Sequence, residues 1–539
     1  PEMEADGVRI EDRPSGGVRI VGGDARGVLY GAGKLLRTSR YDQGGFSAGS
    51  WRGTSIPGKP VRGVYFATHF HNFYHDAPID AVQRYVEDVA LWGFNTLLVW
   101  YDMHHFHGFD TPEAVQFRAR LAAICRAARG VGLDVGFACV ANEGYANSPE
   151  ALRADVTGMR GAKFSTDICT ATPEGSRYVL DSFAQLYDWA ADLQPKWVMI
   201  WPYDSGGCGC AQCQPWGHGG YLRCAEPLAH LARSKFPGAR VILSTWFFDE
   251  SEWAGLTQEF TSRPEWVDYL LVEPAFVSGL RNSPPGHPAP GDLPLVGFPE
   301  ISMVGWPVWG GFGANPLPTR FEREWNGLRA QWQGGFPYSE GIFEDINKAL
   351  FARFYWQADA TAEETLREYI AFEYSPDVVD LVLPAISMLE KNVPGVKSGP
   401  WSLAARDLLE QADGRLSAQA RQAWRWRILY LRAQVDAQLY ASRGALQGRV
   451  LRDAFEELTR IYHAQHAEGP VKPLEVDPTE PPAIPRAADF SGPELAETYA
   501  RAVLASQPIA YWRMSDVAEG TLQDASPHAQ SAVCEAGAE

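Results

Sequence analysis

Short apolar runs alternate with longer amphipathic segments between residues 61 and 356. Continuous apolar runs bounded by turn residues are typical of strands that are buried on both faces. We therefore expect eight buried strands, which lie in VRGVYFATHF, NTLLVWYDMHHF, LDVGFACVANEG, KWVMIWPYDSGG, ARVILSTWFFDE, VDYLLVEPAF, PLVGFPEISM and GGFPYSEGIFEDINKALF.

Helical periodicity fills most of the intervals between these runs. Ile79, Val82, Val86 and Val89 keep one face of the first interval apolar. Further helices are expected at 112–129, 175–193, 221–235, 251–259 and 319–332. This alternation predicts an α/β fold in which 59–356 forms a (β/α)₈ TIM barrel. A doubly wound open sheet is the competing fold, but its usual glycine-rich phosphate turn is missing from ATHFHNF after the first strand.

The segments on either side of the barrel have different patterns. Residues 1–58 contain two short strands and a helix that begins near Gly27, which indicates the remnant of a small N-terminal α/β domain. Residues 357–468 are helical and form a C-terminal annex, and 469–495 are a proline-rich linker. Residues 496–539 resemble the first strands of a laminin-G/concanavalin-like module. The numbering is expected to begin inside a longer precursor, because the first residues do not look like a natural start.

The composition argues against several classes of binding partner. The 539 residues carry a formal net charge of −18, which repels phosphate backbones and anionic lipids, so we expect no nucleic-acid partner. No apolar run approaches the roughly 20 residues that a membrane-spanning helix needs. The 19 Trp, 21 Tyr and 26 Phe include several at expected loop mouths, where flat apolar rings can stack on sugars.

Acidic residues recur where the expected strands end, which is where a barrel of this kind builds its active site. Glycoside hydrolysis needs such carboxyls in pairs, one to protonate the leaving oxygen and one as base, nucleophile or charge stabiliser. Asp204 is the expected general acid and Glu300 the opposing carboxylate, with Glu340 and Glu344 as substitutes. The expected substrate-binding residues are Arg62, His69, His71, Trp100, Asp102, His104, Glu143, Trp201, Tyr203, Trp246, Glu273, Trp306, Trp309 and Tyr338.

A family resemblance rests on the segments VRIVGGDARGVLYGAGKLLR and VRGVYFATHFHNF and on the order of the expected elements. In these features the chain resembles bacterial glycoside hydrolases of the family 20 β-N-acetylhexosaminidase and family 67 α-glucuronidase superfamily. The resemblance implies that Arg62, just before the first strand, binds sugar hydroxyls. Family 20 enzymes carry an Asp-Glu pair after strand four, but here Ser205 follows Asp204, which departs from that pattern. The family 67 arrangement corresponds by position to Asp204, Glu273 and Glu300.

Four cysteines cluster around the loop after the fourth strand. Cys208, Cys210, Cys213 and Cys224, in the spacing C-x-C-x₂-C-x₁₀-C, could bind a structural zinc. One or two disulfides, or free thiols, are the alternatives. In each case the first three sulfurs are expected to lie within a few ångströms of one another and to brace the loop. No cofactor is expected to be required for catalysis.

These observations lead to one main functional prediction and one alternative. We expect a secreted or periplasmic bacterial glycoside hydrolase that acts on a carbohydrate substrate. The resemblance narrows this to an exo-acting enzyme for a hexosaminide, a uronide or a related glycan. The alternative is a catalytically inactive, glycan-binding barrel of a secreted multidomain protein.

Overall fold

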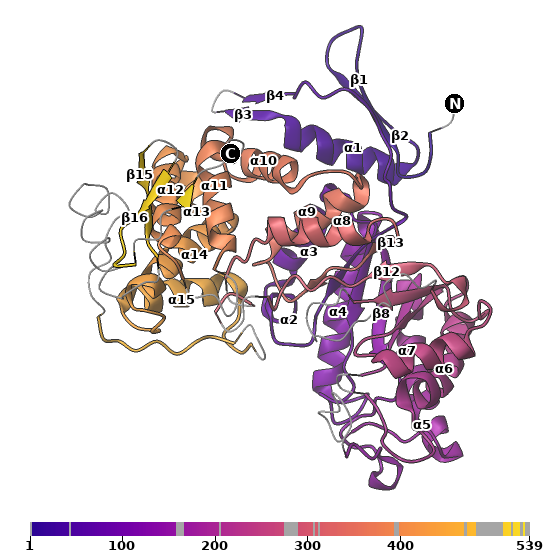
Figure 1. Cartoon of the computed structure of the whole chain (residues 1–539). Helices are drawn as coiled ribbons and strands as arrows, with labels where there is room; N and C mark the ends of the chain where they lie inside the picture. Colours follow the sequence, from indigo (N-terminus) through magenta and orange to yellow (C-terminus); the bar gives the residue numbers. More distant parts are fainter. Residues whose placement is uncertain are drawn as a thin grey trace. The chain divides into compact units, whose positions relative to one another are not determined.

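The computed structural model divides into two compact units, Pro1–Pro481 and Pro482–Glu539. The first unit runs from the N-terminal strands through a barrel to a set of helices (Figure 1). The structure describes residues 3–42, 45–157, 166–203, 206–273, 289–304, 308–310, 313–392, 398–467, 472–480, 510–518, 521–528 and 532–533.

The centre of the first unit is a closed barrel of parallel strands, as predicted. Neighbouring strands pair in sequence order, and the last position closes on β6 through Gly334 opposite Val61 and Tyr338 opposite Tyr65. Two short strands, β13 and β14, share this last position. The strands are β6 (Val61–Phe66), β7 (Thr96–Trp100), β8 (Asp134–Val140), β9 (Trp197–Trp201), β10 (Arg240–Ser244), β11 (Tyr269–Val272), β12 (Leu295–Gly297), β13 (Trp332–Gly335) and β14 (Tyr338–Ser339).

Large rings fill the barrel interior opposite glycines. A Cβ atom on Gly63 would meet the Phe336 ring at 2.1 Å, and one on Gly297 would meet the Trp332 ring at 1.9 Å. Neither glycine could carry a side chain without displacing the facing ring, because protein interiors are close-packed. These pairs make the barrel centre a packed core.

Helices surround the strands much as their periodicity predicts. The helices are α3 (Ile79–Trp92), α4 (Pro112–Gly130), α5 (Pro173–Ala190), α6 (Tyr221–Lys235), α7 (Glu250–Glu259), α8 (Pro318–Leu328) and α9 (Asp345–Trp356). The expectation of a helix up to Trp332 was wrong. The helix α8 ends at Leu328, and Trp332 begins β13, where its ring is buried over Gly297. Burial inside the barrel therefore overrides the helical pattern at this point.

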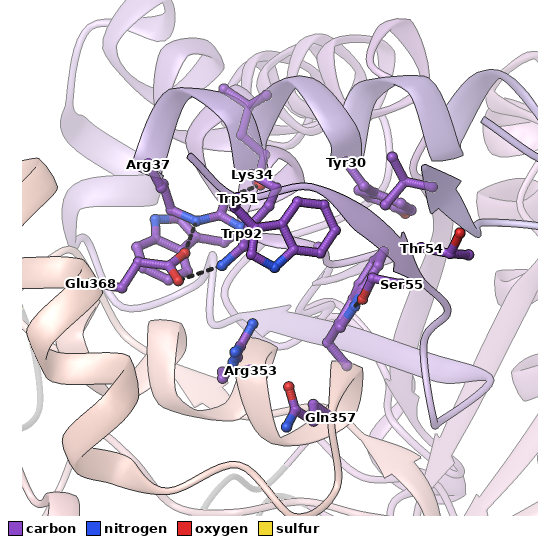
Figure 2. A pocket seen from close by; sticks show the side chains of 14 residues that line it. Tyr30, Lys34, Arg37, Trp51, Thr54, Ser55, Trp92, Arg353, Gln357 and Glu368 are labelled. Carbon is purple, nitrogen blue, oxygen red and sulfur yellow. Dashed lines mark hydrogen bonds and ion pairs between the residues drawn. The ribbon is translucent and has the colours of Figure 1, made fainter. Parts of the chain in front are cut away.

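The N-terminal elements dock against a helix that follows the barrel through a partly buried ion-pair group. The strands β1 (Val8–Asp12), β2 (Val18–Gly22) and β5 (Gly53–Ser55) form a sheet beside α1 (Ala25–Thr38), and β3 (Arg40–Asp42) pairs with β4 (Gly45–Ser47). Figure 2 shows Lys34 and Arg37 of α1 directed at Glu368, with Nζ and Nε 2.6 and 2.8 Å from its carboxylate oxygens. The cavity around them measures about 200 Å³. It includes Gly93, which precedes β7, so it lies at the amino-terminal end of the barrel strands.

Glu368 belongs to the helices that follow the barrel. They are α10 (Ala362–Glu373), α11 (Val379–Glu390), α12 (Trp401–Arg415), α13 (Ala418–Gln422), α14 (Trp424–Ala441) and α15 (Arg449–Tyr462). Arg425 of α14 contacts Asp345 of α9 at 2.7 Å, and Trp309 donates to Asp436 of α14 at 2.7 Å. These buried contacts fasten the helical annex to the barrel.

The second unit contains β15 (Trp512–Ala518), β16 (Thr521–Asp524) and β17 (Ala532–Val533) in an antiparallel sheet. Its expected likeness to a laminin-G/concanavalin-like module stays a prediction, and most of the expected linker lies outside the described residues. Among the residues that the structure describes, no helix has both the length and the apolar character to cross a membrane.

Candidate active site

A second cavity, of about 120 Å³, opens where the barrel strands end. In barrels of this fold the carboxyl ends of the strands carry the active site, so this cavity is the candidate site. Its lining residues are Tyr65, His69, Phe70, Trp100, Asp102, His104, His105, Trp201, Trp246, Phe298, Glu300, Met303 and Tyr338.

Packed aromatic rings form one part of the wall. The ring of Trp201, the last residue of β9, lies 5.2 Å from Trp246, 5.1 Å from Phe298 and 6.0 Å from Trp100, measured between centroids. Because these rings come from different strand ends and pack on one another, each limits the movement of the next. The wall is therefore a rigid apolar surface of the kind that can stack on a sugar ring.

Glu300 is a carboxyl group in this aromatic cavity. Its Oε1 accepts hydrogen bonds from the backbone N–H groups of Ser302 and Met303 at 2.6 and 2.7 Å. Its Oε2 is buried and has no hydrogen-bond partner among the described residues. Burial raises the pKa of Glu300 to about 8, although the two backbone hydrogen bonds act in the opposite direction. At neutral pH the side chain therefore holds a proton, and Oε2 is the oxygen free to carry it.

Glu340 and Glu273 are two further buried acids with raised pKa. Tyr338 donates to Glu340 Oε1 at 2.6 Å, yet burial raises the pKa of Glu340 to about 8. Burial, reinforced by the charge of Glu300, raises the pKa of Glu273 to about 8. Neither Glu340 nor Glu273 is among the residues that line this cavity. The charge of Glu300 makes both acids harder to ionise, because neighbouring carboxylates repel one another.

Glu344 has the contacts of a structural residue. Its Oε1 accepts hydrogen bonds from Ser302 Oγ at 2.9 Å and from the backbone N–H of Glu340 at 2.8 Å. Lys348 lies 3.6 Å from the same oxygen. Glu344 thus holds together the segments after β12 and β14, and we assign it no contact with substrate.

Asp102 lies on another side of the cavity among histidines. The indole N–H of Trp100 donates to its Oδ1, and His105 Nδ1 and His69 Nε2 lie 3.6 and 3.9 Å from its Oδ2. Burial and neighbouring histidines lower the pKa of His69 well below its ordinary value and that of His105 to about 3. These imidazoles are neutral at pH 7 and can offer hydrogen bonds to a hydroxyl-rich ligand.

Glu143 acts through His104. Its Oε1 accepts from the His104 backbone N–H at 3.2 Å and lies 2.6 Å from His104 Nδ1. Glu143 itself is fully buried and does not line the cavity. It therefore positions the His104 ring rather than contacting a ligand.

The structure places other expected binding residues away from the cavity, and the expectation that Arg62 lines it was wrong. Arg62 is the second residue of β6, so its side chain lies at the amino-terminal end, where Nη2 binds Asp6 at 2.7 Å and Nε donates to Gly93 O at 2.8 Å. Trp309 was also expected there, but it packs under the annex on Asp436.

Two more expected residues contact other side chains. His71 contacts Asp76 at 3.7 Å, and Tyr203 donates to Glu252. Neither lines the cavity. Asp204 and Trp306 lie outside the described residues.

Several cavity residues were not among the expected binding residues. Tyr65 and Phe298 belong to or follow buried strands, and Phe70 and Met303 lie in loops after strands. Tyr65 stacks on Tyr338 with centroids 5.4 Å apart. The sequence carries no signal for Tyr65, because the alternation of side chains puts it on the face of Gly63 without showing which face turns to the barrel interior.

The cysteine cluster also differs from expectation in one member. Cys208, Cys210 and Cys213 lie together, but the fourth sulfur beside them belongs to Cys169. Cys224 in α6 instead has its sulfur 2.8 Å from Thr170 Oγ1. None of the described cysteines forms a disulfide.

Comparison with known proteins finds this fold in several solved glycoside hydrolases. No protein-family model and no curated protein matches the sequence. A family GH115 4-O-methyl-alpha-glucuronidase, BtGH115A, with specificity for decorated arabinogalactans, matches 91% of this chain and 73% of its own at 13% identity and a TM-score of 0.57.

Two further solved structures match at similar levels. CpGH89 from Clostridium perfringens, solved with its substrate GlcNAc-alpha-1,4-galactose, matches 84% of this chain and 61% of its own at 11% identity and a TM-score of 0.57. A GH138 enzyme that targets pectin rhamnogalacturonan II matches 85% of this chain and 65% of its own at 9% identity and a TM-score of 0.53. Identities this low show a shared fold, so the resemblance to barrel glycoside hydrolases is confirmed at the level of fold.

Proposed function

We propose that this protein is a glycoside hydrolase in which Glu300 is the proton donor. The observation that supports this most is a buried carboxyl with a pKa of about 8 inside an aromatic cavity at the carboxyl ends of the strands. A general acid must hold its proton at the working pH and release it to the leaving oxygen in the transition state. Glu300 Oε2 meets the first requirement, and its Oε1 is fixed by two backbone N–H groups. This reverses the role expected for Glu300 from the sequence.

The second carboxylate has two candidates. Asp102 follows β7 and Asp204 follows β9, and in the closed barrel each of these strands is three positions from β12, which precedes Glu300. Carboxyls on opposite sides of the mouth can flank a sugar ring and act as base or nucleophile. We favour Asp102, because it lines the cavity and the neutral histidines around it can bind sugar hydroxyls.

The substrate is proposed from the size and lining of the cavity. About 120 Å³ is small beside the roughly 300 Å³ at which typical ligand sites begin. One terminal sugar residue fits such a space better than a chain segment, which supports exo-action. A hexosaminide or uronide is proposed on the resemblance described above. An enzyme that acts on polymeric glycans encounters its substrate outside the cytoplasm, so we propose a secreted or periplasmic enzyme.

Kinetics on carboxyl variants test the proposal. Wild type is assayed on a panel of methyl α- and β-glycosides that includes hexosaminides and uronides, because an alkoxide leaving group must be protonated as it departs. Glu300→Gln should lower kcat by on the order of 10²-fold or more, because the amide cannot donate the proton. Asp102→Asn and Asp204→Asn are compared on the same substrate, and the larger loss, restored by added azide, identifies the second carboxylate. Glu259→Gln, at an exposed position of α7, is the matched control and should keep wild-type rates.

Two outcomes would contradict the proposal. Near-normal turnover in Glu300→Gln would remove Glu300 from the catalytic pair. Sugar binding by the wild type, measured by calorimetry, without turnover of any glycoside would instead identify a glycan-binding barrel.

A further inference from the structure

Four cysteine sulfurs meet between two loops at the end of the barrel strands. The Sγ atoms of Cys169, Cys208, Cys210 and Cys213 all lie within 4.8 Å of one another, and those of Cys169 and Cys210 are 3.7 Å apart. Zinc bound tetrahedrally by thiolates has Zn–S bonds of about 2.3 Å, which puts the sulfurs about 3.8 Å from one another. The cluster therefore has the dimensions of a four-sulfur zinc site.

The backbone around the cluster is organised without any disulfide between these four cysteines. Asn142, which follows β8, donates through Nδ2 to Ile168 O at 2.9 Å and to Gly207 O at 2.8 Å. Its Oδ1 accepts from the Gly207 backbone N–H at 3.0 Å. One buried amide thus joins the residue before Cys169 to the residue before Cys208. Both loops are held in register at the positions that the sulfurs occupy.

Backbone N–H groups also point at two of the sulfurs. The Cys210 N–H donates to the Cys208 sulfur, and the Ala171 N–H donates to the Cys169 sulfur. Groups of this kind surround metal-bound ligands and stabilise the negative charge that thiolates bring to a metal. Cys208 and Cys213 are buried and Cys169 and Cys210 are partly buried, so the cluster is largely shielded from water.

We propose that Cys169, Cys208, Cys210 and Cys213 bind one Zn²⁺ in a closed structural site. Four thiolates leave no open position for water or substrate, so the ion has a structural role. Soft sulfur ligands in tetrahedral geometry select zinc or iron, and zinc needs no redox partner. On binding, the four thiols give up their protons to solvent. The proposal replaces Cys224 of the sequence expectation by Cys169 and is independent of the proposed glycosidase activity.

The site would cross-link two of the loops at the mouth of the barrel. Cys169 lies between β8 and α5, and the other three ligands lie between β9 and α6. Cys208 comes seven residues after Trp201, which is part of the cavity wall. Zinc would therefore fix the segment that leads from that wall into α6.

Metal analysis on the full chain tests the proposal. The protein is produced in zinc-supplemented medium, purified without a metal-affinity tag, dialysed and analysed by mass spectrometry of the elements. Wild type should carry about one zinc per chain. Cys169→Ser and Cys213→Ser should lose it, whereas Cys224→Ser, the matched control, should keep it. Asp102→Asn should also keep it, which separates this site from the Asp102, His104 and His105 group.

A second measurement uses only the wild type and so does not depend on whether variants fold. The four ligand cysteines should resist alkylation before a chelator is added and react after it, as mapped by peptide mass spectrometry. Co²⁺ in place of zinc should show the charge-transfer and ligand-field absorption of tetrahedral thiolate coordination. Zinc retained in Cys169→Ser, iron in place of zinc, or disulfides among these four residues would each overturn the proposal.

Discussion

Glu300 Oε1 accepts the backbone N–H of Met303 at 2.7 Å, so the cavity acid is anchored by the loop that follows it. The anchored oxygen leaves Oε2 as the position for the proton. Because the raised pKa comes from burial, any change that admits water to the cavity should lower it.

The first prediction concerns the pH dependence of turnover. With Glu300 as proton donor and a pKa of about 8, kcat/KM should fall above an apparent pKa near 8, as the carboxyl loses its proton. The residual activity of Glu300→Gln should lack this alkaline limb. Profiles from pH 5 to 10 on one glycoside would show it, and an unchanged alkaline limb in the variant would assign the limb to another group.

The second prediction concerns stability. A carboxyl whose pKa rises from 4.5 to about 8 on folding binds more protons in the folded state, so its contribution is fully present below pH 4.5 and is lost as pH rises through about 8. The free energy of unfolding of wild type minus that of Glu300→Gln should therefore fall between pH 6.5 and 8, by at most about 1.4 kcal/mol per pH unit for one proton. Urea unfolding at fixed pH values measures this difference. A difference that does not change with pH over this range would show that Glu300 is already ionised when folded.

The third prediction separates folding from binding at Arg62. Replacing Arg62 by Met removes its contact with Asp6 at 2.7 Å and leaves Asp6 paired with Arg26 at 2.8 Å, so it should cost about 2 kcal/mol of unfolding free energy. The KM of the folded enzyme should not change, because Arg62 lies at the opposite end of the strands from the cavity. Arg84→Met, at an exposed pair with Asp80, is the control and should cost less than about 1 kcal/mol. A raised KM with normal stability would show instead that Arg62 contributes to substrate binding.

The fourth prediction concerns the ion-pair group of Figure 2. Burial acts to raise the pKa of Glu368, but Arg37 and Lys34 outweigh it and lower the pKa to about 2. Its stabilising contribution is therefore present above pH 4.5 and is lost as pH falls toward 2. Glu368→Gln should lower the unfolding free energy by about 3 kcal/mol at pH 7, since two cations lose their partner.

The matched control for Glu368 is Glu363→Gln on the same helix. Glu363 pairs with Arg367 at the surface, so its loss should change stability by about 0.5 kcal/mol or less. Limited proteolysis would show whether the N-terminal strands detach in Glu368→Gln. Equal stability of the two variants would mean that the ion-pair group of Lys34, Arg37 and Glu368 does not hold the N-terminal elements.

Much of the barrel could be predicted because the sequence patterns that specify its strands and helices are local. Strands buried on both faces are continuous apolar runs in the sequence, and the helices between them have apolar residues at helical spacing. The strands β6 to β12 and most helices therefore follow from the pattern. The pattern failed at Trp332, where a helical spacing continues but the ring is buried against Gly297 in the barrel. A contact between residues so far apart along the chain leaves no local signal.

For the candidate site, too, some features follow from the sequence and others depend on the tertiary structure. That acids follow strand ends, and that three cysteines lie in one short loop, was determined by the sequence alone, because these residues are close along the chain. Only the tertiary structure decided which acid lies in the aromatic cavity, that Arg62 lies at the opposite end of its strand, and that Cys169 rather than Cys224 joins the cluster. Burial and the meeting of separate loops depend on how strand ends are arranged around the closed barrel, and the order of residues does not record that arrangement.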